Sequence, residues 1–157
     1  MLRACVAALR GIASCGVDEA SVIDAPHNTV DAETHGGRAL LVHRKGANAA
    51  HADGAVIIAG SAGTFSVLGT GRGCADALRS CSHGAGRRLS RGEGGRAFSA
   101  RDVGRQLRGV VYDKRLAAKL TPEAPGVYRD MRRVMEAQRG LVRVRERLTP
   151  VVSFKGV

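Results

Sequence analysis

Glycine is concentrated in the middle of this 157-residue chain, and that concentration limits the folds that the chain can adopt. The sequence contains 21 glycines, and eleven of them fall between Gly54 and Gly95. They follow no regular period and are not mixed with serine or proline runs, which excludes collagen-like and flexible-linker architectures. A glycine cluster between short apolar runs instead predicts tight turns and a backbone that a ligand can approach closely.

Charge is distributed unevenly along the chain. The whole chain has a net charge of +11. Residues 1–71 hold 5 basic and 6 acidic side chains, whereas residues 72–157 hold 20 basic and 8 acidic side chains. So basic a C-terminal half favours a polyanionic partner such as phosphate, nucleotide or nucleic acid, although a merely solubilising surface remains the alternative. Aromatic residues make up only 3% of the chain, which disfavours binding of nucleic acid by base stacking.

Several classes of protein are disfavoured by composition. The chain has no run of 18 apolar residues, so no membrane span is expected. The apolar stretch at the N-terminus is interrupted by Arg10, which argues against a signal peptide. The four cysteines form no CxxC motif and no dense framework, and a reduced, cytoplasmic protein is the simplest expectation.

Local patterns predict an α+β fold with mixed sheets and flanking helices, because strands and helices alternate without a regular βαβ rhythm. Helices are expected over 1–14, just after His83 at Gly84-Ala85-Gly86, from an N-cap at Ser99 through Leu107, and over 127–138. Strands or extended segments are expected over 21–24, 38–44, 56–59, 66–68, 110–112 and 141–154, the last with a break at Pro150. The chain is interpreted as a single partial domain over 1–157.

Two short sequences at the ends of predicted strands could bind a metal or an anion. His27 follows Pro26, which fixes the backbone, and a rigid neutral imidazole suits manganese or zinc; the alternative is a turn histidine hydrogen-bonded to backbone. The stretch from Gly60 to Ser66 offers small residues, three hydroxyls and free backbone N–H groups, which can form an anion-binding nest or an ordinary strand–turn–strand.

A second histidine has the surroundings of a nucleophile. His83 precedes Gly84-Ala85-Gly86 and three nearby arginines, so that glycines could let a phosphate approach and arginines could stabilise its charge. No aspartate lies close in sequence to orient the ring, so a backbone carbonyl would have to do so. The alternative is a helix-capping histidine beside a solvated basic face. Lys155 could reach a base or a phosphate as a point charge, or lie on a frayed terminus.

Taken in series, these motifs resemble the C-terminal part of the RtcB family of GTP-dependent RNA-splicing ligases. The resemblance runs from about Asp24 to Gly156 and rests on motifs that occur in the same order. They are His27-Asn28, Glu33-Thr34-His35-Gly36-Gly37-Arg38, Val42-His43-Arg44-Lys45-Gly46-Ala47, Gly60-Ser61, Ser82-His83-Gly84-Ala85-Gly86-Arg87 and Lys155-Gly156. It implies the C-terminal part of the RtcB catalytic fold, and a ligase that joins an RNA 3′-phosphate or 2′,3′-cyclic phosphate to a 5′-hydroxyl with GTP and Mn²⁺.

The resemblance also implies a role for each matching residue. His83 would be the nucleophile that takes GMP from GTP, His27 a manganese ligand, and Asn28 a contact of the GMP. Lys155 would contact guanine. The remaining nucleotide-binding positions would be Ala59, Gly60, Ser61, Ala62, Ser66, Gly84, Ala85 and Gly86.

The sequence departs from the family pattern in two ways. Members usually carry Pro-Gly-Ser-Met where this chain has Ala59-Gly60-Ser61-Ala62, and an aromatic residue where it has Val67. The family's other manganese ligands lie in Asp-x-x-Cys and Gly-Asn-His stretches of an N-terminal half, and neither stretch occurs here. Two hypotheses therefore stay open: a ligase portion that is active with a complementing N-terminal half, and an incompetent remnant that binds phosphate or RNA through its basic half.

Overall fold

The computed structural model describes residues 2–13, 16–19 and 22–155, and it combines short strands with short helices. The strands are β1 (Asn28–His35), β2 (Arg38–Lys45), β3 (Ala47–Ala49), β4 (Ala55–Ile58), β5 (Ser66–Gly71), β6 (Ser80–Ser82) and β7 (Val142–Leu148). The helices are α1 (Leu2–Ala13), α2 (Arg91–Ala97), α3 (Ala100–Gln106) and α4 (Met131–Ala137). Short 3₁₀ turns are η2 (Ala75–Ala77), η3 (Lys114–Leu116), η4 (Thr121–Glu123) and η5 (Pro125–Val127).

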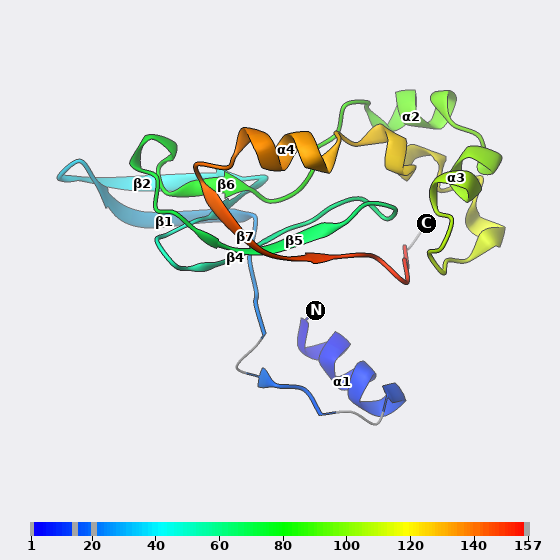
Figure 1. Cartoon of the computed structure of the whole chain (residues 1–157), viewed down its shortest axis with the longest axis horizontal. Coiled ribbons are helices and arrows are strands. Elements are labelled where there is room, and N and C mark those ends of the chain that lie inside the picture. Colours follow the sequence, from blue (N-terminus) through cyan, green and yellow to red (C-terminus); the bar gives the residue numbers. More distant parts are fainter. Residues whose placement is uncertain (1, 14–15, 20–21, 156–157) are drawn as a thin grey trace.

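The strands form three small sheets, ordered β1-β2, β3-β6 and β4-β5-β7 (Figure 1). Every strand pair is antiparallel, and parallel pairing occurs among the described residues only as the isolated bridges Ala59–Gly84 and Val111–Val152. The prediction that helices and strands are mixed in one fold is therefore confirmed, but the sheets themselves are antiparallel rather than mixed.

The β1–β2 hairpin is unusual because its first strand is mostly polar. Its turn is made by Gly36 and Gly37, whose positive φ angles of 55° and 77° suit glycine. Arg44 on β2 is buried and lies 2.9 Å from Asp31 and 2.6 Å from Glu33 on β1. This ion pair, rather than an apolar face, stabilises the pairing of the two strands, and the sequence analysis did not predict β1.

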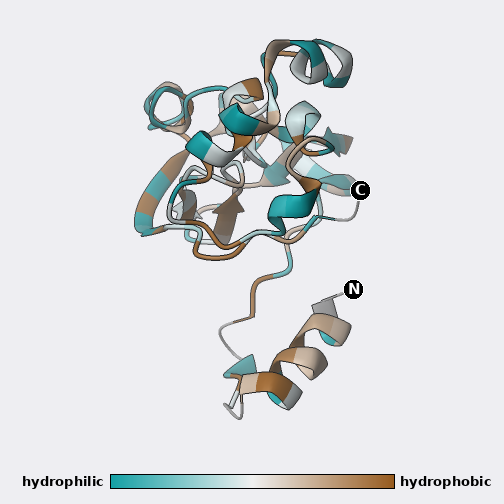
Figure 2. Cartoon of the chain, turned by 90° about the vertical axis from the view of Figure 1, so that its right-hand side faces the viewer, coloured by the Kyte–Doolittle hydropathy of each residue, from teal (hydrophilic) through white to brown (hydrophobic). Residues whose placement is uncertain are grey.

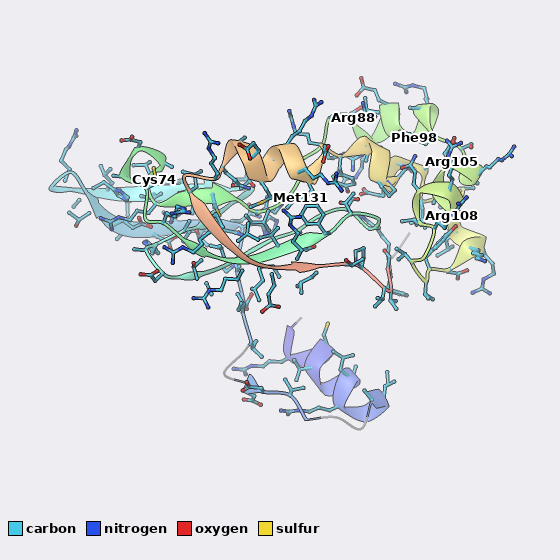
Figure 3. The ribbon with its side chains drawn as sticks, viewed as in Figure 1. Cys74, Arg88, Phe98, Arg105, Arg108 and Met131 are labelled. Carbon is cyan, nitrogen blue, oxygen red and sulfur yellow. The ribbon has the colours of Figure 1, made fainter. Side chains whose placement is uncertain are left out.

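Two apolar clusters form the core, and one tyrosine packs against both. The first lies between α4 and the three-stranded sheet, and Met131, labelled in Figure 3, is among its fully buried residues together with Ile58 and Val67. The second lies beneath α3 and includes Val103. Tyr128 packs against both clusters and so connects them.

Helix α1 lies apart from this core, below the sheet in Figures 1 and 2, and residues 22–27, which form no helix or strand, lead into β1. Its predicted limits at Met1 and Ser14 fall outside the described residues, and the helix is confirmed between them. No helix within the described part of the chain is long and apolar enough to cross a membrane.

Several predicted elements are confirmed. The strands expected at 38–44, 56–59 and 66–68 correspond to β2, β4 and β5, and the extended C-terminal segment contains β7. The helix at Ser99 is also confirmed: the Ser99 hydroxyl accepts from the Asp102 backbone N–H, and the Asp102 carboxylate accepts from the Ser99 N–H.

Other predicted elements are wrong. The segment 84–86 is extended rather than helical, because Gly84 bridges Ala59 and Gly86 has a φ of 69°; the next helix begins at Arg91, capped by Ser90. The helix expected from 127 begins only at 131, since residues 125–127 form η5 and Asp130 is the N-cap. The segment 110–112 makes a single bridge, and residues 22–24 form no strand, while Ser21 lies outside the described residues.

Candidate nucleotide-binding site

The site is organised by a backbone crossing between the end of β4 and the segment after β6. The Ala59 N–H donates to the His83 carbonyl at 2.9 Å, and the Ala85 N–H donates to the Ala59 carbonyl at 2.9 Å. A Cβ on Gly84 would lie 2.9 Å from the Ala59 carbonyl oxygen. The crossing therefore requires the glycine, and it brings the Gly60–Ser66 loop beside His83.

His83 is oriented by backbone, as the absence of a nearby aspartate required. Its Nδ1 donates to the Gly46 carbonyl at 2.7 Å, because a carbonyl can only accept. This bond places the proton on Nδ1 and leaves Nε2 with a free lone pair. Gly46 has a φ of 69°, a conformation that glycine adopts without strain, and its N–H donates to the His27 carbonyl at 2.8 Å.

His27 and His83 lie against each other. Their rings stack with centroids 4.8 Å apart and an interplanar angle of 23°. They come from separate elements, one immediately before β1 and the other immediately after β6, and Gly46 hydrogen-bonds to both. Asn28 begins β1 and pairs with Lys45 in the hairpin.

The loop from Gly60 to Ser66 is held by its own hydroxyl groups. The Gly60 N–H donates to Ser66 Oγ at 3.0 Å, and the Ser61 N–H donates to Thr64 Oγ1 at 2.8 Å. A Cβ on Gly60 would lie 2.2 Å from the Phe65 carbonyl oxygen, so only glycine fits there. The N–H groups of Gly60 and Ser61 are therefore engaged by hydroxyl groups of the loop itself.

Two pockets lie side by side at this point and share Tyr128. The larger has a volume of about 1130 Å³, and its lining includes His83, Gly84, Ala85, Gly86 and three arginines, Arg88, Arg129 and Arg133. Arg88, labelled in Figure 3, lies in the region between α4 and α2. The smaller has a volume of about 460 Å³, and its lining includes Gly60, Ser61, Ala62, Glu123 and Lys155. The structure thus brings Lys155 to the serine loop, while His83 faces the neighbouring pocket.

A largely buried carboxylate, that of Glu123, holds Lys155 in the smaller pocket. Glu123 Oε2 lies 2.8 Å from Lys155 Nζ and accepts a short hydrogen bond from the Tyr128 hydroxyl. Arg87 lies 3.2 Å from the same oxygen. Burial would raise the pKa of Glu123, but the hydrogen bonds from Lys155 and Tyr128, with the charges of Lys155 and Arg87, lower this pKa to about 2.

The residues that the structure describes do not by themselves complete the expected manganese site. Among the described residues, no three His, Cys, Asp or Glu side chains are grouped so that they could hold a metal ion. His27 supplies one imidazole, and a stable site needs further ligands. Any metal at this position would need donors from outside these residues.

Three residues of the site were missed by the sequence analysis as functional candidates: Gly46, Glu123 and Tyr128. Gly46 lies in a quoted motif, but its contact with His83 joins residues 37 positions apart. Glu123 and Tyr128 meet Lys155 only through the fold. The sequence offers only a weak signal for these two residues, namely that they flank Pro125-Gly126.

Comparison with known proteins identifies the relatives of this chain. A sequence model of the family described as "tRNA-splicing ligase RtcB" matches residues 1–156. The chain belongs to the RtcB family. It is 41% identical over 135 residues to the RNA-splicing ligase RtcB of Escherichia coli K12, covering 85% of this chain and 32% of that protein.

Two further RtcB proteins show the same partial coverage. The tRNA-splicing ligase RtcB of Nanoarchaeum equitans is 32% identical over 170 residues, covering 94% of this chain and 35% of the relative. The RNA-splicing ligase RtcB of Mycobacterium tuberculosis is 34% identical over 154 residues, covering 85% of this chain and 36% of the relative. The chain thus spans about one third of the length of the RtcB proteins that it matches, and the recognition from sequence is confirmed.

Proposed function

We propose that this chain is the nucleotide-transfer portion of an RtcB-type RNA ligase, which uses GTP to join RNA 3′-phosphate or 2′,3′-cyclic phosphate ends to 5′-hydroxyl ends. The observation that carries the proposal is the geometry of His83. Its Nδ1 donates to the Gly46 carbonyl, so Nε2 carries the lone pair of the ring, and the ring lines a pocket rich in arginine and glycine. An imidazole in that state is a nucleophile for phosphorus.

In the proposed first step, Nε2 of His83 attacks the α-phosphorus of GTP. The Nε2–P bond forms, the bond from the α-phosphorus to the bridging oxygen breaks, and pyrophosphate leaves. The Gly46 carbonyl stabilises the positive charge that develops on the ring, and Arg88, Arg129 and Arg133 supply positive charge around the phosphates.

The next step returns His83 to its starting state, and the last step joins the RNA ends. A 2′,3′-cyclic phosphate is first opened by water to a 3′-phosphate and a 2′-hydroxyl. A 3′-phosphate oxygen of the RNA then attacks the same phosphorus, the N–P bond breaks, and GMP is transferred to the RNA end. Finally the 5′-hydroxyl oxygen attacks the 3′-phosphorus, its proton passes to solvent, and GMP leaves. In this assignment guanine occupies the smaller pocket, with Lys155 as a contact, and Ala59, Gly60, Ser61, Ala62 and Ser66 surround the guanosine.

The manganese implied by the family would neutralise phosphate charge, with His27 as one ligand and Asn28 beside the GMP. The remaining ligands would come from a complementing N-terminal RtcB segment, whether part of a longer chain or a separate one. We therefore expect little activity from residues 1–157 alone.

A test of the proposal is the transfer of label from α-³²P-GTP to the chain, with MnCl₂, in the presence and absence of the N-terminal two thirds of a relative. The expected result is acid-labile label that requires the N-terminal segment and is lost in His83→Ala. A matched control is His43→Ala, which removes an exposed histidine from β2. Label that persists in His83→Ala, or no label in any combination, would overturn the proposal.

A second candidate function is binding of phosphate or RNA without catalysis. It is favoured by the arginines of the larger pocket, which do not depend on a metal. Salt-sensitive RNA binding in the absence of any label under all conditions would support it.

A further inference from the structure

We propose that Glu123 is the residue that positions Lys155 for selective recognition of the 6-oxo group of a purine, and so sets the base preference of the smaller pocket. The inference rests on the proposed function, since it assumes that guanine occupies this pocket.

Glu123 is placed as a positioning group should be. Its side chain is only 12% exposed, and it lies on η4, whereas Lys155 is 44% exposed and lies on the C-terminal segment 32 residues later. The 2.8 Å contact between them fixes the ammonium group of Lys155 at the lining of the pocket. A long, flexible lysine on a terminal segment would otherwise lose considerable side-chain entropy on binding a base.

The carboxylate is itself held by three other side chains. The hydroxyl of Tyr128 donates to Oε2, and Arg87 lies 3.2 Å from the same oxygen. On the other side, Arg91 Nε donates to Oε1 at 3.2 Å. The guanidinium of Arg87 also sits over the Tyr128 ring, 5.2 Å from the centroid, which holds the ring in place. Tyr128 borders both pockets, so this network connects the lining of the smaller pocket to that of the larger one.

The group at position 6 of a purine determines whether the fixed ammonium group of Lys155 can bind it. Guanine and hypoxanthine present an oxygen acceptor at position 6, whereas adenine presents an amino group that donates. An ammonium group fixed opposite position 6 has only protons to offer, so it favours the first two bases and is left without a partner by adenine. A lysine free to swing away would discriminate much less.

The experiment measures equilibrium binding of GTP, ITP and ATP, using the preparation that takes the label in the test above. We expect the wild type to bind GTP and ITP with similar affinity and ATP at least about tenfold more weakly. Both Lys155→Met and Glu123→Gln should reduce this preference to about twofold or less. In the Lys155→Met background, Glu123→Gln should then change the preference no further, because its effect passes through Lys155.

Controls separate positioning from a purely structural role. Glu136→Gln removes the same charge from an exposed ion pair with Arg139 and should leave both base preference and stability unchanged. Glu123→Asp keeps the charge but shortens the side chain by one methylene, so it tests the idea with a milder change if Glu123→Gln does not fold. We expect Glu123→Asp to lower the preference for GTP over ATP while the melting temperature stays close to that of the wild type.

The outcomes distinguish this inference from the proposed function. If the chain takes label but Glu123→Gln or Glu123→Asp, once folded, keeps the wild-type preference, Glu123 is only a structural anchor and the inference alone is overturned. A wild type that prefers GTP strongly over ITP would also overturn it, since position 6 would not be the feature that is recognised. If no preparation takes label or binds GTP, the proposed function and this inference are both overturned.

Discussion

The imidazole rings of His27 and His83 stack 4.8 Å apart, although 56 positions separate them in the sequence. The stack is held by backbone rather than by other side chains, because the Gly46 N–H donates to the His27 carbonyl and the Gly46 carbonyl accepts from His83 Nδ1. The orientation of His83 therefore depends on three chain segments that meet at one point.

The first prediction separates metal coordination from ring packing as the role of His27. If His27 is a metal ligand, both His27→Ala and His27→Phe should slow the labelling of His83 by at least about 100-fold, although His27→Phe retains an aromatic ring for the stack. The rate of label incorporation from α-³²P-GTP in the complemented preparation checks this. Near-normal labelling in His27→Phe would show that the ring only packs against His83.

The second prediction concerns the backbone at Gly46. A β-branched residue is strained at a φ of 69°, so Gly46→Val should destabilise the fold by about 1–2 kcal/mol and also slow labelling at least tenfold, because the carbonyl that orients His83 must shift. Gly46→Asn should be much milder, since asparagine tolerates this conformation. Labelling rates and urea denaturation check both effects.

A matched control exists in the hairpin turn. Gly36 has a φ of 55°, and no atom lies within 4 Å of a Cβ built there. Gly36→Val should therefore cost similar stability while leaving the labelling rate of the folded protein unchanged. Equal rates for Gly46→Val and Gly36→Val would contradict an orienting role for Gly46.

The elements that could be predicted from sequence are those whose signals are local. Ser99 and Asp102 are three residues apart, and their reciprocal hydrogen bonds form within a single helical turn. The sequence therefore predicts the start of α3. Strands β2, β4 and β5 are likewise predicted by a local signal, the run of apolar residues within each strand.

The elements that were missed depend on contacts between distant segments. Strand β1 carries alternating polar residues, and its partner is a buried arginine on β2 that no pattern within β1 could reveal. The sequence predicts a helix that starts at Val127, but Val127 is buried in the cluster beneath α3, and Tyr128 packs, partly buried, against both clusters. Tertiary packing rather than helical periodicity therefore accounts for these two residues. In the site, the motifs identified His83 and Lys155, whereas Glu123 could be found only once the fold brought it to Lys155.

The third prediction concerns the pH dependence of stability through Glu33. The hydrogen bond from Arg44 lowers the pKa of Glu33 from 4.5 to about 2 against the opposing effect of burial, and the hydrogen bond with His35 contributes in the same direction. Because the pKa is lower in the folded state, the stabilisation is present above pH 4.5 and is lost as the pH falls toward 2.

Glu33→Gln should therefore cost about 2 kcal/mol of unfolding free energy at pH 7 and progressively less as the pH falls from 4.5. Urea denaturation at pH 7, 4 and 3 measures this difference. Glu136→Gln, in an exposed pair, should cost less than about 0.5 kcal/mol throughout. A penalty for Glu33→Gln that stays constant with pH would contradict the assignment of the ion pair with Arg44.

The fourth prediction concerns RNA contacts of the larger pocket. Arg129 and Arg133 are exposed and line this pocket, so they are available to phosphates of the RNA end. The double variant Arg129→Ala/Arg133→Ala should bind a single-stranded RNA with a 3′-phosphate more weakly. The slope of log K against log salt should become shallower by about 1.4, since each phosphate contact contributes about 0.7 for a single strand.

Arg139→Ala is the control for this measurement. Arg139 is also exposed, but it pairs with Glu136 and lies outside the lining of the pocket, so its removal alters the net charge without removing a pocket contact. We expect its salt slope to match that of the wild type, and the slope is measured by fluorescence anisotropy from 50 to 300 mM KCl. Equal slopes for all three proteins would mean that RNA is bound elsewhere on the basic half and that the larger pocket serves the nucleotide alone.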